Sequence, residues 1–254
     1  MEKTTTITQN RRNIEWMLLM YLLTVVFPYD LIIQHNLWTP TLRISAFILF
    51  LFYYRYYQRK AGLLLPVQKV KVIALIWMIP LITLTISNII YLWILNEPTN
   101  PLNPLNLLMT LPVTILVVMS EELLFRGQLI QHYFANETLL KRILFSSLVF
   151  AALHLLNLFS GIPIGQVLLQ VVYTWVLGMV LGTAYAFTQH MMVPIMLHFC
   201  FNVVNQTIYQ QLAVSNPNWL YFVVNSLIGI LVMIYCLYLL RFVIPSKHLQ
   251  NEEM

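Results

Sequence analysis

Residues 105–130 read LNLLMTLPVTILVVMSEELLFRGQLI, a long apolar run that holds two glutamates and one arginine. An α-helix needs about 20 residues to cross the roughly 30 Å of hydrocarbon in a bilayer, and this run is long enough to do so. Charged side chains inside such a helix are costly and are usually functional. The run therefore predicts a transmembrane helix that carries part of a functional site.

The composition of the whole chain is that of a membrane protein. Of 254 residues, 59% are hydrophobic and 9% are charged, whereas an ordinary soluble domain has roughly 25% charged residues. The formal net charge is +5, but the basic residues form no single cluster, so no nucleic-acid partner is predicted. Cys200 and Cys236 both lie inside apolar runs, which argues against a disulfide framework or a CxxC metal site. The predicted environment is the lipid bilayer.

The apolar runs predict an all-α, polytopic membrane protein with about eight transmembrane helices. We expect a single integral membrane domain over residues 1–254, with both termini cytoplasmic. The span 42–57 is shorter than a usual transmembrane helix, and the length of the span 143–160 is marginal. The predicted spans are residues 14–33, 42–57, 72–95, 105–130, 143–160, 164–187, 191–210 and 219–243.

The distribution of lysine and arginine supports this topology. With eight spans and a cytoplasmic N-terminus, thirteen of the fourteen lysines and arginines fall on the cytoplasmic side, and only Arg43 falls outside. Membrane proteins place their basic loop residues mainly inside. Merging two spans or losing one would put several of these charges on the wrong side of the membrane.

Three of the predicted spans carry polar side chains within the hydrocarbon. Ionisable groups at such positions are expensive to bury and are read as functional by default. The residues are Glu121, Glu122 and Arg126 in span 105–130, His154 in span 143–160, and His198 and Asn202 in span 191–210.

The spacing of these residues predicts local contacts. Glu122 and Arg126 are four residues apart, so a helix places them on one face, where they can form an ion pair. Glu121 is turned about 100° away from Glu122 around the helix. His198 and Asn202 also share a face because they are four residues apart. Phe150 and His154 share a face for the same reason, which suits an aromatic ring packed beside an imidazole.

Depth in the membrane gives a second test. At about 1.5 Å per residue, Glu121, His154 and His198 come out roughly 10 to 16 Å from the cytoplasmic ends of their spans. A single buried polar residue in a membrane helix is more often an interhelical strut than a catalyst. Six such residues at one depth favour a shared functional site.

The three polar sets resemble the motifs of a known family. Glu121-Glu122-xxx-Arg126, Phe150-xxx-His154 and His198-xxx-Asn202 are similar, in this order, to the motifs of the CAAX-processing and bacteriocin-processing (CPBP, Abi) family of intramembrane proteases. The resemblance covers about residues 120–202, within a motif-bearing core at about 105–210. Residues 1 to about 100 are supported by hydropathy alone.

The resemblance implies hydrolysis of a peptide bond inside a membrane cavity. Eukaryotic members remove the last three residues of prenylated CAAX proteins, and many bacterial members are associated with peptide bacteriocins and self-immunity. With 254 residues and short loops, this chain looks more like the bacterial branch, and this resemblance implies a bacterial plasma membrane. The implied partners are a peptide or lipidated-protein substrate and components of a bacteriocin system.

The chemistry of the side chains suggests a role for each. A carboxylate at moderate depth can act as the base that deprotonates water. We assign this role to Glu121, because Glu122 is better placed to be held by Arg126. His154 would then position the water, and His198 with Asn202 would stabilise the developing oxyanion.

No cofactor is predicted with certainty, and a divalent metal such as zinc is the alternative. Glu121, His154 and His198 could hold a zinc ion with one open position. The chain lacks the HExxH sequence, in which the spacing itself indicates a metal.

Two other functions fit the same residues. A proton-coupled transporter would use membrane carboxylates as relay groups, but such carriers usually contain internal repeats, and none is evident here. A non-catalytic immunity or scaffold protein on the same fold is the second alternative. The intact set of motif residues favours the protease.

The topology is directly testable. Reporter fusions after Pro98 and after Ser160 should report an external location, and a fusion after Ala135 should report a cytoplasmic one, because each lies in a loop between predicted spans. The measurement is the paired activity of a periplasmic and a cytoplasmic reporter at each position. An external location for Ala135 would contradict both the topology and the shared depth of the polar residues.

Overall fold

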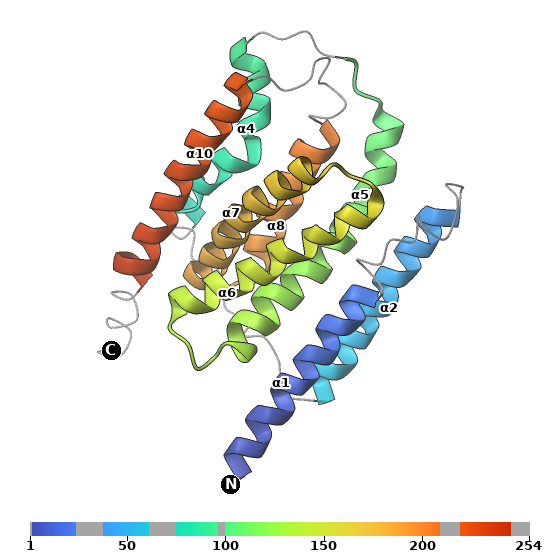
Figure 1. The fold of residues 1–254 in the computed structure, drawn as a ribbon, viewed down its shortest axis with the longest axis vertical. Coiled ribbons are helices and arrows are strands. Elements are labelled where there is room, and N and C mark those ends of the chain that lie inside the picture. Colours follow the sequence, from blue (N-terminus) through green and yellow to red (C-terminus); the bar gives the residue numbers. More distant parts are fainter. Residues whose placement is uncertain (1, 24–37, 61–74, 96–99, 209–218, 245–254) are drawn as a thin grey trace. The chain divides into compact units, whose positions relative to one another are not determined.

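The computed structural model describes residues 2–23, 38–60, 75–95, 100–208 and 219–244 (Figure 1). Within these ranges the regular structure is helical and no strand occurs, which confirms the all-α prediction. The α-helices are α1 (Glu2–Tyr21), α2 (Trp38–Lys60), α4 (Ile79–Leu95), α5 (Pro104–Glu122), α6 (Leu139–Ala152), α7 (Ile164–Thr188), α8 (Met192–Asn202) and α10 (Trp219–Tyr238).

Several helices continue into a segment of a different helical type. The α5 helix is followed directly by a π-helix, η3 (Leu123–Tyr133), and α6 by a 3-10 helix, η4 (Leu153–Ser160). Two further π-helical segments, η5 (Val203–Ile208) and η6 (Leu239–Val243), follow α8 and α10. Hydropathy does not distinguish these types, so each of these spans was predicted as one continuous helix.

The helix bounds differ from the predicted spans at the N-terminal end. The α1 helix begins at Glu2 rather than at residue 14, and residues 24–33 of the first predicted span lie outside the described residues. The α2 helix has 23 residues, so the span predicted as short is long enough to cross a bilayer. Residues 72–74 of the third predicted span also lie outside the described ranges.

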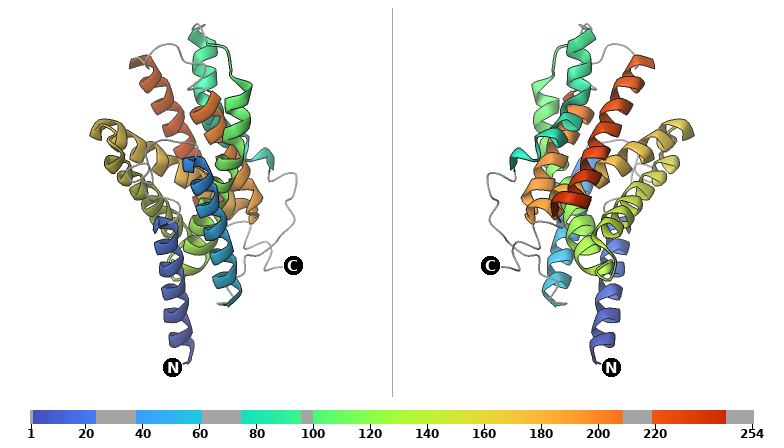
Figure 2. Two further views of the ribbon diagram at one scale, coloured as in Figure 1. Left: turned by 90° about the vertical axis from the view of Figure 1, so that its right-hand side faces the viewer. Right: turned by 90° about the vertical axis from the view of Figure 1, so that its left-hand side faces the viewer.

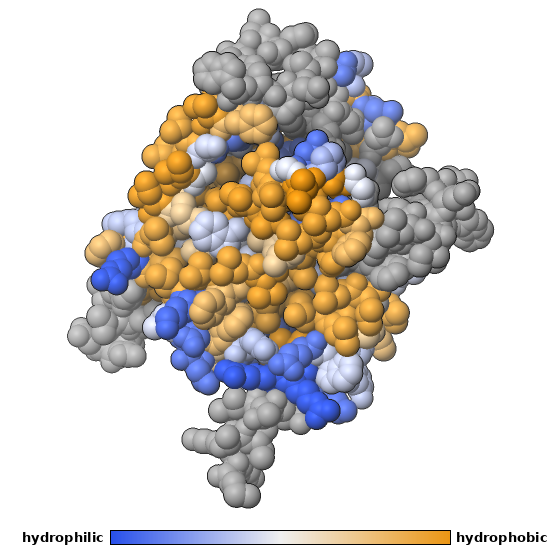
Figure 3. All heavy atoms as spheres, in the orientation of Figure 1, coloured by the Kyte–Doolittle hydropathy of each residue, from blue (hydrophilic) through white to orange (hydrophobic). Residues whose placement is uncertain are grey.

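Three helices in the described part of the chain are long and apolar enough to cross a membrane: Leu139–Phe159, Ile164–Thr188 and Leu220–Val243. Shorter apolar helices cover Ile79–Tyr91 and Met192–Asn205. Apolar side chains cover most of the described surface on the face drawn in Figure 3, as a protein surrounded by lipid requires. The chain is a helical membrane protein, while the count of eight spans and the cytoplasmic termini stay predictions.

The chain divides into two compact units. The first comprises residues 1–66 and 116–178, and the second comprises residues 67–115 and 179–254. Helices α5 and α7 contribute residues to both units. The predicted single membrane domain and its core at 105–210 stay predictions.

Helices α1 and α2 each bury one face in the core of the first unit. In α1 the buried residues Ile14, Met17 and Tyr21 are spaced three and four apart, the spacing of a helix face. In α2, Phe50 and Tyr54 are buried in the same way. These side chains pack in one cluster with Leu124, Phe125 and Leu129 of η3 and Phe150 of α6.

Helices α6 and α7 approach closely at Gly178. A Cβ atom added to Gly178 would lie 2.9 Å from the Cβ atom of Ser147 and 3.1 Å from its Cα atom. The sequence Gly178-xxx-Gly182 predicts close helix packing, and the contact at Gly178 confirms it for that residue.

The second unit packs α4 against α10 and against the continuous stretch of α8 and η5, and Figure 2 shows α4 beside α10 in both views. The Asn205 side-chain amide donates to the Thr85 carbonyl at 2.9 Å. The rings of Tyr91 and Tyr221 meet edge to face at 5.2 Å. One polar contact thus joins α4 to η5, which continues the helix of the third motif, and one aromatic contact joins α4 to α10.

The close approach at Gly178 predicts a position-specific effect of an added methyl group. Gly178→Ala should lower the free energy of unfolding by about 1–3 kcal/mol, the usual cost of overpacking. Gly229→Ala is the matched control, because a Cβ atom at Gly229 would meet nothing within 4 Å. The control should be neutral or stabilising by up to about 1 kcal/mol through helix propensity. Thermal unfolding of the purified proteins in detergent measures both, and equal melting temperatures would contradict the close contact.

Candidate active site

An ion pair lies at the end of α5. The Arg126 Nη1 atom is 3.0 Å from Glu122 Oε1, and the exposed fractions of the two side chains are 1% and 0%. This is the pair that the four-residue spacing predicts. Because an unpaired charge at this depth would cost several kcal/mol, each partner needs the other in the folded state.

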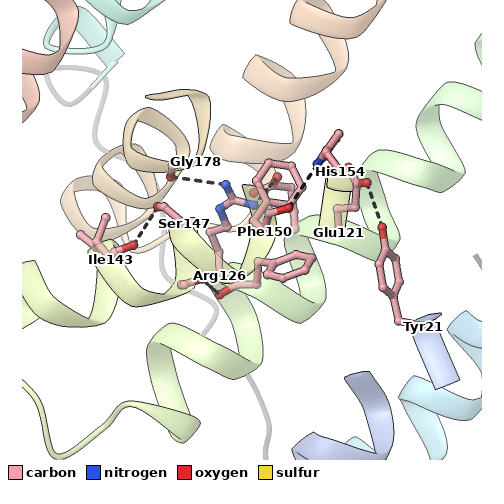
Figure 4. A network of polar contacts seen from close by, with 11 residues as sticks. Tyr21, Glu121, Arg126, Ile143, Ser147, Phe150, His154 and Gly178 are labelled. Atoms are coloured by element: carbon pink, nitrogen blue, oxygen red, sulfur yellow. Dashed lines mark hydrogen bonds and ion pairs between the residues drawn. The ribbon is translucent and has the colours of Figure 1, made fainter. Parts of the chain in front are cut away.

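Two further contacts hold the Arg126 guanidinium. Its Nη2 atom donates to the Gly178 carbonyl oxygen of α7 at 3.3 Å. The guanidinium carbon also lies 4.7 Å from the centre of the Phe150 ring of α6, within the range of a cation–π interaction. Figure 4 shows Arg126 among these partners. The sequence did not predict these two contacts, because they depend on how α6 and α7 pack.

Glu121 has a different partner from Glu122. The Tyr21 hydroxyl of α1 donates to Glu121 Oε1 at 2.9 Å, across a separation of 100 residues. Glu121 is 8% exposed, and Figure 4 shows the Tyr21 ring pointing toward its carboxylate. No local sequence pattern relates Tyr21 to Glu121, so this hydrogen bond was not predicted.

His154 lies just beyond the end of α6, on the second residue of η4. Its ring meets the Phe150 ring edge to face at 5.5 Å, as their four-residue spacing predicts. The His154 Nδ1 atom is 3.2 Å from the Phe150 carbonyl oxygen. A proton on Nδ1 would be donated to this carbonyl, so the Nε2 nitrogen would then serve as a hydrogen-bond acceptor.

Side chains also support the backbone of η3, beside the two glutamates. The Tyr54 hydroxyl donates to the Leu123 carbonyl at 3.2 Å, and the Ser146 hydroxyl donates to the Phe125 carbonyl at 2.8 Å. Gln128 in turn donates to the Tyr54 hydroxyl at 2.8 Å. Helices α2 and α6 therefore both anchor the π-helical segment that follows the glutamates.

The third motif lies in the second unit. His198 and Asn202 of α8 are buried, with 2% and 7% exposure, and they share a helix face with Asn205 one turn further on. The prediction that His198 and Asn202 line one cavity with Glu121 and His154 stays a prediction, as does their shared depth.

The zinc alternative requires Glu121, His154 and His198 to meet around one ion. Among the described residues, no group of three or more histidine, cysteine, aspartate or glutamate side chains is arranged to hold a metal ion. The zinc set therefore stays a prediction, and we derive no step of the reaction through a metal.

The chain was compared with models of protein families. Residues 103–204 match the model of the Rce1-like family, described as type II CAAX prenyl endopeptidase Rce1-like. The matched segment is thus similar to CAAX proteases, in agreement with the resemblance of its motifs. Comparison with curated proteins and with solved structures gave no significant match.

The CAAX-protease match covers every predicted site residue. It contains Glu121, Glu122, Arg126, His154, His198 and Asn202. It supports a membrane protease of the CAAX type, and it does not extend to α1 or α2, which lie before residue 103. The role of each residue is inferred from the contacts described above.

The buried ion pair predicts a loss of stability when it is broken. Glu122→Gln leaves Arg126 buried without its countercharge, so unfolding should become easier by about 3–5 kcal/mol. The exposed pair Lys141–Glu137 is the matched control: it has the same four-residue spacing at 3.3 Å, with 58% and 41% exposure. Glu137→Gln should change stability by less than about 1 kcal/mol. The amount of folded protein in membranes and its melting temperature measure the difference, and a normally accumulating Glu122→Gln would contradict the structural role of the pair.

Proposed function

We propose that the chain is an intramembrane endopeptidase in which Glu121 activates a water molecule for attack on a peptide bond. The observation that carries this proposal is the different environment of two adjacent carboxylates. Glu122 accepts from the Arg126 guanidinium at 3.0 Å, and Glu121 accepts from the neutral Tyr21 hydroxyl at 2.9 Å. Titratable groups held in different environments take different roles in catalysis.

The charge of the partner decides which glutamate can accept a proton. Protonation of Glu122 would remove the countercharge of a buried guanidinium, and an uncompensated buried charge is strongly destabilising. Glu121 also attracts Arg126, but less strongly than Glu122 does, and its hydrogen bond from Tyr21 comes from a neutral group. Protonation of Glu121 therefore leaves the ion pair of Arg126 with Glu122 intact. Glu121 is therefore the better general base, and Glu122 is the better structural anion.

The reaction can be written with these residues alone. Glu121 takes a proton from water while the water oxygen attacks the carbonyl carbon of the peptide bond. His154 positions the water, and His198 and Asn202 donate hydrogen bonds to the oxyanion. The C–N bond then breaks, and the proton on Glu121 passes to the leaving amine nitrogen. The products are a free carboxyl end and a free amine.

The substrate class follows from the matched segment and the membrane location. The matched family is described as a type II CAAX prenyl endopeptidase, so we propose a membrane-associated peptide, such as one that ends in a prenylated CAAX sequence. A role in bacteriocin self-immunity or maturation rests on the family resemblance alone. Comparing bacteriocin sensitivity and processing in cells with and without the intact protein tests that role.

The general-base assignment predicts a large kinetic effect. Glu121→Gln keeps the shape of the side chain and removes the base, so the rate of cleavage should fall by about two to four orders of magnitude. The assay uses the purified full chain in detergent micelles and a fluorogenic peptide that ends in a prenylated CAAX sequence. Glu121→Gln should accumulate like the wild type, and Glu137→Gln should retain full activity.

The alternatives give different results. Full activity of Glu121→Gln, with a folded but inactive Glu122→Gln, would reverse the two roles. A wild-type protein that neither cleaves the probe nor alters the membrane peptidome of its cells, relative to Glu121→Gln, would overturn the protease proposal. That outcome would favour a non-catalytic scaffold or a carrier.

A further inference from the structure

We infer that Tyr21 is a positioning residue for Glu121, which brings α1 into the active site. This inference rests on the proposed role of Glu121 as general base. The Tyr21 hydroxyl donates to Glu121 Oε1 at 2.9 Å, and both side chains are buried. The family match begins at residue 103, so it assigns nothing to α1.

Packing determines the direction of the Tyr21 side chain. Tyr21 is 2% exposed and belongs to the same face of α1 as Ile14 and Met17. Its ring meets Phe50 edge to face at 5.4 Å and Phe125 at 6.0 Å. A ring held by α2 on one side and by η3 on the other presents its hydroxyl in one direction, toward Glu121.

The hydrogen bond distinguishes the two carboxylate oxygens. Tyr21 donates to Oε1, and we propose that the proton taken from water goes to the other oxygen, Oε2. The protonated carboxyl group keeps a carbonyl-like oxygen at Oε1, which still accepts from Tyr21. Tyr21 thus keeps its own proton throughout the cycle and restrains the rotation of the carboxyl group. Such positioning of a reacting group can contribute substantially to a rate.

A single-atom substitution tests this role. Tyr21→Phe keeps the ring against Phe50 and Phe125 and removes only the hydroxyl. Hydrogen bonds to charged groups are the stronger ones, so kcat should fall by about 10- to 100-fold. KM for the prenylated fluorogenic peptide should stay within about twofold of the wild type, because Tyr21 acts on the base and not on the bound peptide.

Tyr133→Phe is the matched control. Tyr133 packs against the same cluster as Tyr21, and its hydroxyl also donates to a glutamate, Glu15 Oε1, at 3.1 Å. The substitution therefore removes the same chemical group from the same kind of hydrogen bond, at a carboxylate outside the candidate site. Tyr133→Phe can lower the melting temperature, but kcat per folded molecule should equal that of the wild type.

The double variant Glu121→Gln/Tyr21→Phe tests whether Tyr21 acts through Glu121. If it does, the double variant should be no slower than Glu121→Gln alone, because residues that act as a unit have non-additive effects. Wild-type kcat in Tyr21→Phe, an equal loss of kcat in Tyr133→Phe, or full additivity in the double variant would each overturn the inference. A slow Glu121→Gln beside an unaffected Tyr21→Phe would refute the role of Tyr21 alone, whereas a fully active Glu121→Gln would refute the proposed function.

Discussion

The buried guanidinium of Arg126 is the constraint on which the first unit depends. A charge with 1% exposure needs a countercharge and hydrogen-bond acceptors, because burial removes it from the solvent that would otherwise stabilise it. Glu122 supplies the charge, the Gly178 carbonyl accepts a hydrogen bond, and the Phe150 ring covers the guanidinium. These partners come from α5, α7 and α6, so one side chain sets the spacing of three helices. The carbonyl is within reach because a glycine there lets α7 approach Ser147.

The same constraint separates the roles of the two glutamates. Once Glu122 is turned toward Arg126, the helix turns its neighbour Glu121 about 100° away. Glu121 then meets the buried face of α1, where Tyr21 donates to it. One carboxylate is held by a cation, and the other is held by a neutral group. Two residues adjacent in sequence can therefore serve folding and chemistry separately.

Sequence reasoning succeeded where contacts are local. The Glu122–Arg126 pair and the packing of Phe150 on His154 both follow from a four-residue spacing, and both are present. The contact of Tyr21 with Glu121 was out of reach, because it joins residues 100 positions apart and depends on the packing of α1. Hydropathy predicted the all-helical class, but it cannot detect a change of helical type. Such a change alters which backbone groups are hydrogen-bonded to each other and leaves the composition the same.

Those changes of helical type coincide with the motifs. Among the described residues, α5 ends at Glu122 and becomes a π-helix, α6 gives way to a 3-10 helix one residue before His154, and α8 ends at Asn202 and becomes a π-helix. The junction after α10 carries no motif, so the pattern is an association and not a rule. Irregular helical segments occur often at functional sites, and they persist only where their surroundings enforce them. Hydrogen bonds from α2 and α6 to carbonyls of η3 provide that support beside the glutamates. Part of the packing energy of the membrane core thus maintains the geometry of the site.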